Sequence, residues 1–474
     1  MSVALLSYLA STVPPVYALQ TRIVATGVPA VSPSLTDYYE GEKRVVNIGG
    51  NFYAFYFNGT SLVYKAWING TAWNGTYVAG MQKTGALAPD SNRWALGTTT
   101  VNGNQYVSLV YWHYSGTQVK VEAIRGLVTP GKLISSWSTP YTLLTLSNKT
   151  NTSCPHGLCI AAHEANATNG TLLLTVRWLD SSSHYSREKF RSNDGGLTFP
   201  KNWGAFSTSD TTKIEIVMTR LANGNMLQVQ ARYGSPDFSY WVYNSTTGDW
   251  AGPSFTTGAN MTNNAIKQIS ADSDTSNSPY IAYVTGNPSG ALKVARWFNN
   301  GTFNKFETAN STLSHALPSI TITRDNVVHI YTIASSGGSN KVWETTKNGT
   351  TWLASTNAFG STFNSPDQIT AAISYPGAIW EENSATPYNL MFESTLDKFG
   401  IKKLYPTNSS GNEWYSSWNN GHARVINMNG KPDPDDSWLN VTGFSYPTST
   451  GYLQVGSSKP PHLSCSWCVF VLWS

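Results

Sequence analysis

Charged residues are scarce in this sequence, and those present form no block of one sign. Asp, Glu, Lys and Arg make up 12% of the 474 residues, and the formal net charge is only +4. Because the Lys and Arg residues are scattered, the chain offers no basic stripe to a phosphate backbone, and we expect no nucleic-acid partner. Aromatic residues, at 13%, supply ample apolar surface to bury, which excludes an intrinsically disordered chain.

Long apolar runs are also missing, except near the two ends of the sequence. Residues 1–18 are mostly apolar and end in Val16-Tyr17-Ala18, which fits a cleavage site, so they predict a signal peptide, with an ordinary apolar strand as the alternative. The C-terminal extension, 406–474, ends in the apolar segment 465–473, which is shorter than the ~20 residues that cross a bilayer. We interpret this segment as a closing strand or as a truncated anchor, so membrane attachment stays open. A signal peptide predicts an extracellular or cell-surface protein.

Cysteine is rare, and the four residues form two close pairs. Cys154 and Cys159 lie close together, and in an exported protein this spacing predicts a local disulfide. With His156 and His163 the same pair spells C-x-H-x2-C-x3-H, which would suit zinc, but we expect no metal and no cofactor. N-glycosylation sequons agree with export, and they begin at Asn58, Asn69, Asn74, Asn148, Asn151, Asn166, Asn169, Asn244, Asn260, Asn300, Asn310, Asn348, Asn408 and Asn440.

A repeated unit of short strands organises the chain. Residues 62–73 and 341–352 each read as an aromatic-rich strand, an Asn-Gly turn and a further aromatic, and 240–250 and 292–303 are related copies. Asn and Gly tolerate the positive φ of tight hairpin turns, and the copies recur roughly every 50 residues, which suits units of four strands. The prediction is an all-β chain with a single β-propeller of six or seven four-stranded antiparallel blades over 41–405; an array of sandwiches is the alternative. The expected blades cover residues 41–88, 93–147, 154–209, 213–262, 264–314, 316–365 and 366–405.

One copy of the repeat carries a specific motif. Residues 192–199 read Ser-Asn-Asp-Gly-Gly-Leu-Thr-Phe, which resembles the Asp box, S-x-D-x-G-x-T-W, with Phe in place of Trp. On this motif the chain resembles the sialidase-like superfamily of Asp-box (BNR-repeat) β-propellers. The resemblance implies a structural turn on the outer rim, in which a carboxylate accepts backbone N–H groups and a glycine takes the left-handed conformation. The residues of this structural Asp box are Ser192, Asp194, Gly196, Thr198 and Phe199.

The same resemblance implies where a site would lie. Enzymes of this family bind a sugar carboxylate with three arginines and cleave the glycosidic bond with a Tyr nucleophile, an assisting Glu and an Asp acid. Arg44, Arg232 and Arg296 match the arginines and are the ligand-binding candidates. Glu215 and Tyr331 are the catalytic candidates.

The match is incomplete where the chemistry is most demanding. Leu317 stands where the family pattern places its Tyr, and the turn at 69–76 has no carboxylate to act as the acid. Glu164 with Arg177 offers a rival register. We therefore expect a non-catalytic secreted or cell-surface propeller, an adhesin or cell-envelope component, that binds glycans or other surface proteins. The alternative is an exo-glycosidase of sialidase type acting on acidic sugars, and self-association stays open.

Overall fold

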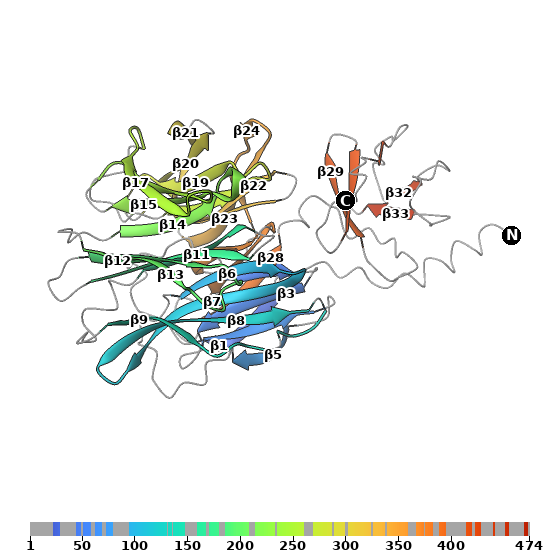
Figure 1. Cartoon of the computed structure of the whole chain (residues 1–474). Helices are drawn as coiled ribbons and strands as arrows, with labels where there is room; N and C mark the ends of the chain where they lie inside the picture. Colours follow the sequence, from blue (N-terminus) through green and yellow to red (C-terminus); the bar gives the residue numbers. More distant parts are fainter. Residues whose placement is uncertain are drawn as a thin grey trace. The chain divides into compact units, whose positions relative to one another are not determined.

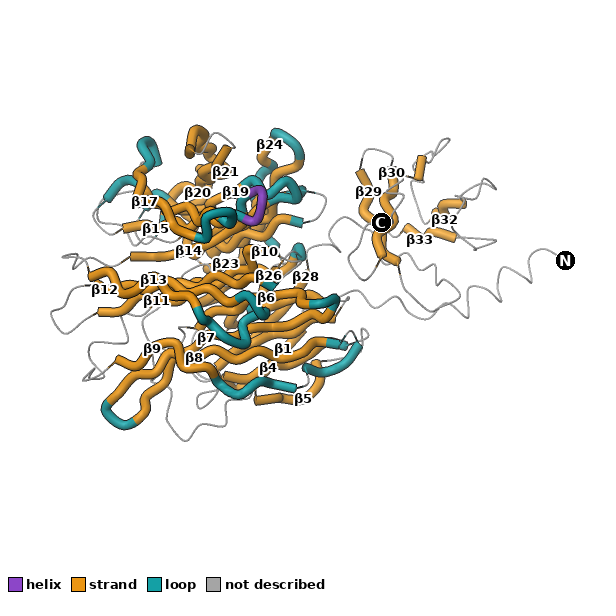
Figure 2. The backbone as a smooth tube through the Cα atoms, viewed as in Figure 1, coloured by secondary structure: helices purple, strands orange, loops and turns teal. Residues whose placement is uncertain are grey.

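The structure, a computed structural model, consists almost entirely of strands. The part of the chain that it describes contains one helical segment, the short 3-10 turn η1 (Ala222–Gly224), so the all-β expectation is confirmed (Figure 2). The described residues are 22–28, 44–48, 51–57, 62–68, 73–78, 94–129, 131–134, 136–146, 159–166, 170–179, 185–207, 214–232, 235–259, 269–286, 289–298, 302–323, 326–336, 339–358, 366–373, 375–382, 388–394, 414–419, 422–427, 439–440, 451–454 and 469–472.

Strands from the first to the twenty-eighth form the larger compact part of the molecule (Figure 1). Their bounds are β1 (Arg22–Val28), β2 (Val45–Ile48), β3 (Asn51–Phe57), β4 (Leu62–Trp67), β5 (Trp73–Val78), β6 (Trp94–Val101), β7 (Asn104–Ser115), β8 (Gln118–Val128), β9 (Tyr141–Leu146), β10 (Cys159–Asn166), β11 (Thr171–Leu179), β12 (Tyr185–Ser192), β13 (Lys201–Ser207), β14 (Ile214–Arg220), β15 (Met226–Arg232), β16 (Phe238–Asn244), β17 (Asp249–Phe255), β18 (Ile269–Ser273), β19 (Pro279–Val284), β20 (Gly290–Phe298), β21 (Thr302–Ile322), β22 (Val328–Ser336), β23 (Ser339–Asn348), β24 (Thr351–Trp352), β25 (Thr356–Asn357), β26 (Pro366–Ile373), β27 (Gly377–Glu382) and β28 (Tyr388–Ser394).

These strands pair with their neighbours in sequence. β2 to β5, β6 to β9, β10 to β13 and β14 to β17 each pair in order, and every one of these pairings is antiparallel. β18 to β24 form one continuous sheet, and β25 pairs with β23. The long strand β21 serves both halves of that sheet, because Thr302–His315 pairs with β20 and His315–Ile322 pairs with β22.

The first strands of successive groups lie side by side. β10 lies against β6 and β14, and β18 lies against β14 and β21. β21 also lies against β26, which pairs in parallel with β2 through Val45 and Ala372. The group β2–β5 shares one hydrophobic cluster with the group β6–β9, so the sheets follow one another around a ring. This is the arrangement of a β-propeller.

A strand from the start of the chain completes the last group. β1 lies at the edge of the sheet that contains β28, β27 and β26. Val24 of β1 is 1% exposed and belongs to the same hydrophobic cluster as Phe392 of β28. The compact unit runs from Ile23 to Phe392, whereas the sequence placed the propeller at 41–405. β1 carries no copy of the repeat and its partner β28 lies far along the chain, so the repeat by itself does not place this strand.

Residues 1–22 and 393–474 form a second, separate unit. Its described strands make two small sheets, one of β29 (Trp414–Asn419), β30 (His422–Asn427) and β31 (Leu439–Asn440), and one of β32 (Gly451–Gln454) and β33 (Val469–Leu472). The apolar C-terminal segment thus contributes a paired strand, β33. The expected signal peptide lies outside the described residues. In the part of the chain that the structure describes, no helix is long and apolar enough to cross a bilayer.

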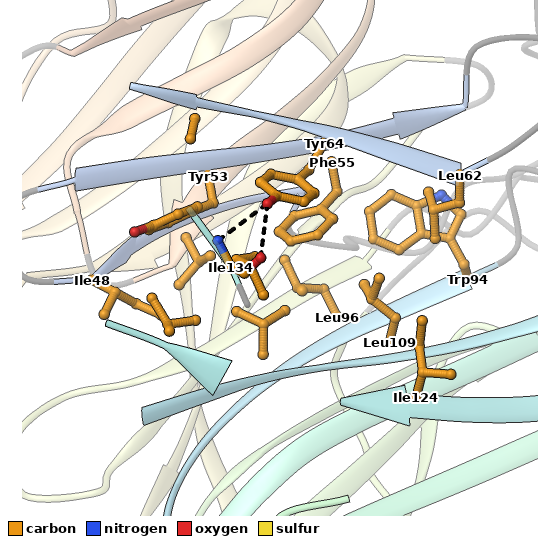
Figure 3. Packing of buried hydrophobic residues seen from close by; sticks show 14 of the residues in the cluster. Ile48, Tyr53, Phe55, Leu62, Tyr64, Trp94, Leu96, Leu109, Ile124 and Ile134 are labelled. Atoms are coloured by element: carbon orange, nitrogen blue, oxygen red, sulfur yellow. Dashed lines mark hydrogen bonds between the residues drawn. The ribbon is translucent and has the colours of Figure 1, made fainter. Parts of the chain in front are cut away.

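Aromatic side chains fill the layer between neighbouring sheets. Figure 3 shows Tyr53, Phe55 and Tyr64 facing the apolar side chains of the next group. The ring centres of Phe55 and Trp94 lie 6.3 Å apart, and both rings are buried. The Tyr64 hydroxyl donates to the carbonyl of Ile134 (3.3 Å) and accepts from its N–H (3.1 Å). Burial of each such side chain contributes roughly 2–3 kcal/mol, so these layers hold the sheets together.

Candidate functional site

Two of the three candidate arginines face carboxylates of the protein itself. Arg44 Nη1 lies 3.9 Å from Glu381 Oε1, and both side chains are buried. Arg296 Nη1 lies 3.9 Å from Glu307 Oε1, and its guanidinium carbon lies 4.5 Å from the ring centre of Tyr280. Because each guanidinium already engages a different protein carboxylate, the geometry favours structural ion pairs over a shared sugar-binding cluster for these two arginines.

Of the two catalytic candidates, Tyr331 is buried, and the side chain of Glu215 is not described. Glu215 of β14 stands opposite Ala231 of β15, and Ala231 directly precedes Arg232 in the chain. The structure does not describe the side chains of Glu215 and Arg232. Tyr331 lies opposite Glu344 in β22 and has no exposed surface. A phenol that is fully buried in this way does not reach a substrate, so its place is in the core.

Two further positions of the expected site can be placed in part. Leu317 lies at an irregularity of β21 and has a φ of 51°. In the rival pair, Arg177 is 2% exposed in β11, and the side chain of Glu164 lies outside the described residues. Of the turn expected at 69–76, residues 69–72 lie outside them as well, and 73–76 belong to β5 (Trp73–Val78).

The predicted disulfide and most of the sequons also fall outside the described part. Cys154 and the side chain of Cys159 are not described. Among the sequons, the structure describes the side chains of Asn244 and Asn310. Asn244 is exposed, whereas Asn310 is 9% exposed.

One carboxylate organises the turn between β12 and β13. Asp194 Oδ1 accepts the backbone N–H groups of Leu197 (3.0 Å) and Thr198 (2.9 Å), and Oδ2 accepts the Thr198 hydroxyl (2.6 Å). The Ser192 hydroxyl donates to Asp194 Oδ1 (2.7 Å) and accepts from Gly196 N–H (2.8 Å). Burial alone would raise the pKa of Asp194, but the hydrogen bonds from Thr198, Ser192 and Leu197 lower it below its usual value.

The same turn is anchored to the preceding sheet. The carbonyl of Gly195, whose φ is 74°, accepts from the hydroxyls of Ser108 (2.9 Å) and Thr99 (3.3 Å). Arg125 donates to the carbonyl of Asp194. Phe199 is 4% exposed and packs in a hydrophobic cluster that includes side chains of both sheets. These contacts tie two sheets together and leave the Asp194 carboxylate engaged within its own turn.

A cationic stripe runs along β12 on the face toward the next sheet. Arg187, Lys189 and Arg191 occupy alternate positions, and alternate residues of a strand point to the same face. Lys189 Nζ lies 3.8 Å from the ring centre of Trp250 and 5.1 Å from that of Trp241. The stripe therefore lies between the sheets β10–β13 and β14–β17. We name the set Arg187, Lys189, Arg191, Trp241 and Trp250 the cationic ladder.

The arginines of the cationic ladder contact aromatic and amide groups of the opposite sheet. The guanidinium carbon of Arg187 lies 4.3 Å from the ring centre of Trp241, and Arg187 Nη1 donates to Gln230 Oε1 (3.3 Å). Arg191 Nη1 donates to the hydroxyl of Tyr243 (2.9 Å). Contacts of a cation with an aromatic face contribute about 0.5–2 kcal/mol, so they hold the charged groups in place without neutralising them.

Lys189 is the most deeply buried cation of the ladder, with 4% of its surface exposed. Burial, with a further contribution from the charge of Arg187, lowers the pKa of Lys189 to about 6. Glu188 points to the other face of the strand, and burial raises its pKa. Among the described residues, the contacts of the Lys189 ammonium are the ring faces of Trp241 and Trp250. The ladder thus places the guanidinium groups of Arg187 and Arg191 on either side of a lysine whose charged form burial disfavours.

The outer end of the cationic ladder reaches solvent. Trp203 of β13 is partly exposed, and its indole N–H donates to Asp249 Oδ1 (3.0 Å). Its ring packs edge-on against Trp250 with 6.4 Å between the centres. The side chains of Lys201 and Asp249 are 45% and 64% exposed and lie 3.9 Å apart. Lys201 Nζ lies 5.2 Å from the ring centre of Trp203. A partly exposed indole flanked by both charges can offer a sugar an apolar surface together with hydrogen-bonding groups.

The sequence carried a signal for the ladder in the alternation Arg187, Lys189, Arg191. Their aromatic partners lie on strands more than one hairpin away, so the face toward which they point becomes apparent only once the sheets are packed.

Comparison with known proteins adds little to these observations. No protein-family model matches the chain, and a search of curated proteins finds no significant match. Among solved structures, an ulvan lyase of a polysaccharide lyase family is similar at 14% identity and a TM-score of 0.49, over 79% of this chain and 94% of that one. A lectin in complex with alpha methyl fucoside is similar at 14% identity and 0.37, over 71% and 96%. The six-bladed lectin of Aleuria aurantia is similar at 13% identity and 0.36, over 72% and 97%.

Proposed function

We propose that this chain is a seven-bladed β-propeller that binds carbohydrate at the cell surface or outside the cell and does not cleave it. The seven blades are β2–β5, β6–β9, β10–β13, β14–β17, β18 with β19, β20 and the first part of β21, the rest of β21 with β22–β25, and β26–β28 with β1. His315 supports the division of β21, because it pairs with Gly290 on one side and with Ala334 on the other.

The cationic ladder and its exposed edge carry the binding proposal. Trp203 and Trp250 meet at the outer end of the ladder, where Lys201 and Asp249 are exposed. A flat indole face packs on the C–H groups of a sugar ring, and charged groups beside it hydrogen-bond to the hydroxyls. The aromatic rings around Phe55, by contrast, are buried inside the fold.

The proposal that the chain does not cleave its ligand rests on the same residues that suggested an enzyme. Hydrolysis by the sialidase route requires an accessible nucleophile, whereas Tyr331 is fully buried. Arg44 and Arg296 engage Glu381 and Glu307 instead of standing open for a substrate carboxylate. These contacts support a binding protein over an exo-glycosidase.

A glycan array run beside a fluorogenic sialoside assay tests the proposal. We expect the wild-type protein to bind a defined set of glycans and to release no fluorophore. Trp203→Ala should weaken binding by about tenfold or more, because it removes the accessible indole. Phe255→Ala is the matched control: Phe255 is 66% exposed on β17, so its loss should leave binding unchanged. Binding to no glycan, or hydrolysis that Glu215→Gln abolishes, would overturn the proposal.

A further inference from the structure

We infer that the cationic ladder binds the acidic group of a glycan, a sulfate or a carboxylate, between the third and fourth blades. This inference rests on the proposed carbohydrate-binding function and specifies its ligand class. It depends on unpaired hydrogen-bond donors that line the ladder.

Two buried amides face the layer that Lys189 occupies. Gln228 and Gln230 are 0% and 2% exposed, and they lie on β15, which pairs with β16 so that Gln228 stands opposite Trp241. Gln228 Oε1 accepts from the Thr175 hydroxyl (2.7 Å), and Thr175 stands directly opposite Lys189 on β11. Since directly opposite residues project from the same face of a sheet, this hydrogen bond brings the Gln228 amide to the Lys189 layer.

Within the residues that the structure describes, the amide nitrogens of both glutamines have no hydrogen-bond partner. In the described part of the chain, buried side-chain nitrogens without a partner include Gln228 Nε2, Gln230 Nε2, Arg191 Nε and Trp250 Nε1. The oxygens of both amides are already engaged, because Gln230 Oε1 accepts from Arg187. All four unpaired groups are therefore donors, and a buried donor without an acceptor is unfavourable.

An oxyanion satisfies unpaired donors of this kind better than a neutral sugar does. Sulfate and carboxylate oxygens are acceptors only, whereas a sugar hydroxyl also brings a donor that needs its own acceptor. The ammonium of Lys189 and the guanidinium of Arg191 add charge-assisted hydrogen bonds, which are the strongest available to an oxyanion. The partly exposed Arg191 and Trp250 lie at the end of the ladder that reaches solvent, where a polysaccharide would enter.

Dextran, dextran sulfate and carboxymethyl dextran test the inference, because they share one backbone and differ in the acidic group. We expect dextran sulfate or carboxymethyl dextran to bind at least about tenfold more tightly than dextran, and the stronger of the two identifies the source of the anion. Lys189→Met keeps the aliphatic stem against the Trp rings and removes the charge, and it should abolish the preference. Lys132→Gln removes one exposed charge elsewhere and should preserve it.

Inorganic sulfate tests the site without a sugar. It should raise the melting temperature of the wild-type protein and not that of Lys189→Met, and melting curves also show whether each variant is folded. If folded Lys189→Met keeps the preference, or if sulfate has the same effect on both proteins, the inference is wrong. Binding of uncharged glycans with no preference for acidic ones would also overturn it, while the proposed function would stand. Binding of no glycan at all would contradict both the inference and the proposed function.

The pH provides a further readout. The groups that face Lys189 are Arg187 and Arg191 on its own strand, Tyr243 and the Trp rings across the layer, and Lys201 and Asp249 at the edge. Because the pKa of Lys189 is about 6, its ammonium is charged at pH 5 and largely neutral at pH 8 without a ligand. Dextran sulfate should therefore bind more tightly at pH 5, and equal affinities at both pH values would argue against a role for Lys189.

Discussion

At the scale of single residues, Asp194 stabilises the fold through hydrogen bonds confined to one turn. Its carboxylate accepts from Leu197, Thr198 and Ser192. Asp194→Ala removes these bonds and leaves backbone N–H groups without their acceptor, so we expect a loss of about 2 kcal/mol in the free energy of unfolding. Urea denaturation measures it, with Asn193→Ala as the control because Asn193 is exposed beside it. If Asp194→Ala unfolds at the same urea concentration as wild type, the stability of the turn does not depend on the carboxylate.

Glu307 predicts a pH dependence of stability. Burial alone would raise its pKa, but hydrogen bonds from Lys305, Lys347 and Trp352 lower the pKa from 4.5 to about 2. Between these values the unfolded chain binds more protons than the folded one, so the contribution of Glu307 is present above pH 4.5 and is lost as the pH falls toward 2. Urea midpoints measured from pH 7 to pH 2 should fall in this window.

The Glu307→Gln variant isolates that contribution. It keeps the size of the side chain and removes the titrating group, so its stability should be lower than wild type at pH 7 and should decline less below pH 4.5. If the urea midpoints of wild type and Glu307→Gln fall in parallel as the pH is lowered, another group causes the loss of stability in acid.

Burial predicts which of two described sequons carries a glycan. Asn244 is exposed at the end of β16, whereas Asn310 is 9% exposed and its Oδ1 accepts from Thr312, Leu313 and His315. A glycan on Asn310 has no room beside these partners. Peptide mapping of protein secreted from a glycosylating host should therefore find a glycan at Asn244 and none at Asn310, and full occupancy of Asn310 would contradict this environment.

At the scale of elements, β1 closes the sheet formed by β26, β27 and β28. Removing residues 1–28 exposes the edge of β28 and the apolar cluster that Val24 covers, and an unpaired strand edge promotes association. We expect the melting temperature to fall by about 5 °C or more and the truncated protein to aggregate. Removing residues 1–18 is the control and should change neither property. Equal melting temperatures for the two truncations would show that β1 is dispensable.

The sequence located most strands but could not assign every strand to its sheet. Hairpin turns such as the one after Asn348 mark pairs that are local in the chain, and local pairs can be read from a repeat. β1 and β28 pair across the whole length of the propeller, and no local pattern records that pairing. The long strand β21 continues through His315, where its pairing changes from β20 to β22, and no turn marks that position.

The candidate site shows a similar limit at the residue level. Family resemblance pointed to Arg44 and Arg296, but their carboxylate partners Glu381 and Glu307 lie on other strands and could not be paired with them in advance. The cationic ladder required knowledge of which sheets face each other. Residue types within one strand are visible in a sequence, whereas the layer between two sheets is a property of packing.

At the scale of the whole molecule, the central claim is that a propeller binds an acidic glycan between two blades and leaves it intact. Hydrogen–deuterium exchange with and without dextran sulfate tests this claim without altering any residue. We expect slower exchange in β12, β16 and β17. Exchange should be unchanged in β2, which follows Arg44, and in β20, which contains Arg296. The glycan should show no new reducing ends. Protection centred on β2 and β20, or release of sugar fragments, would contradict the account.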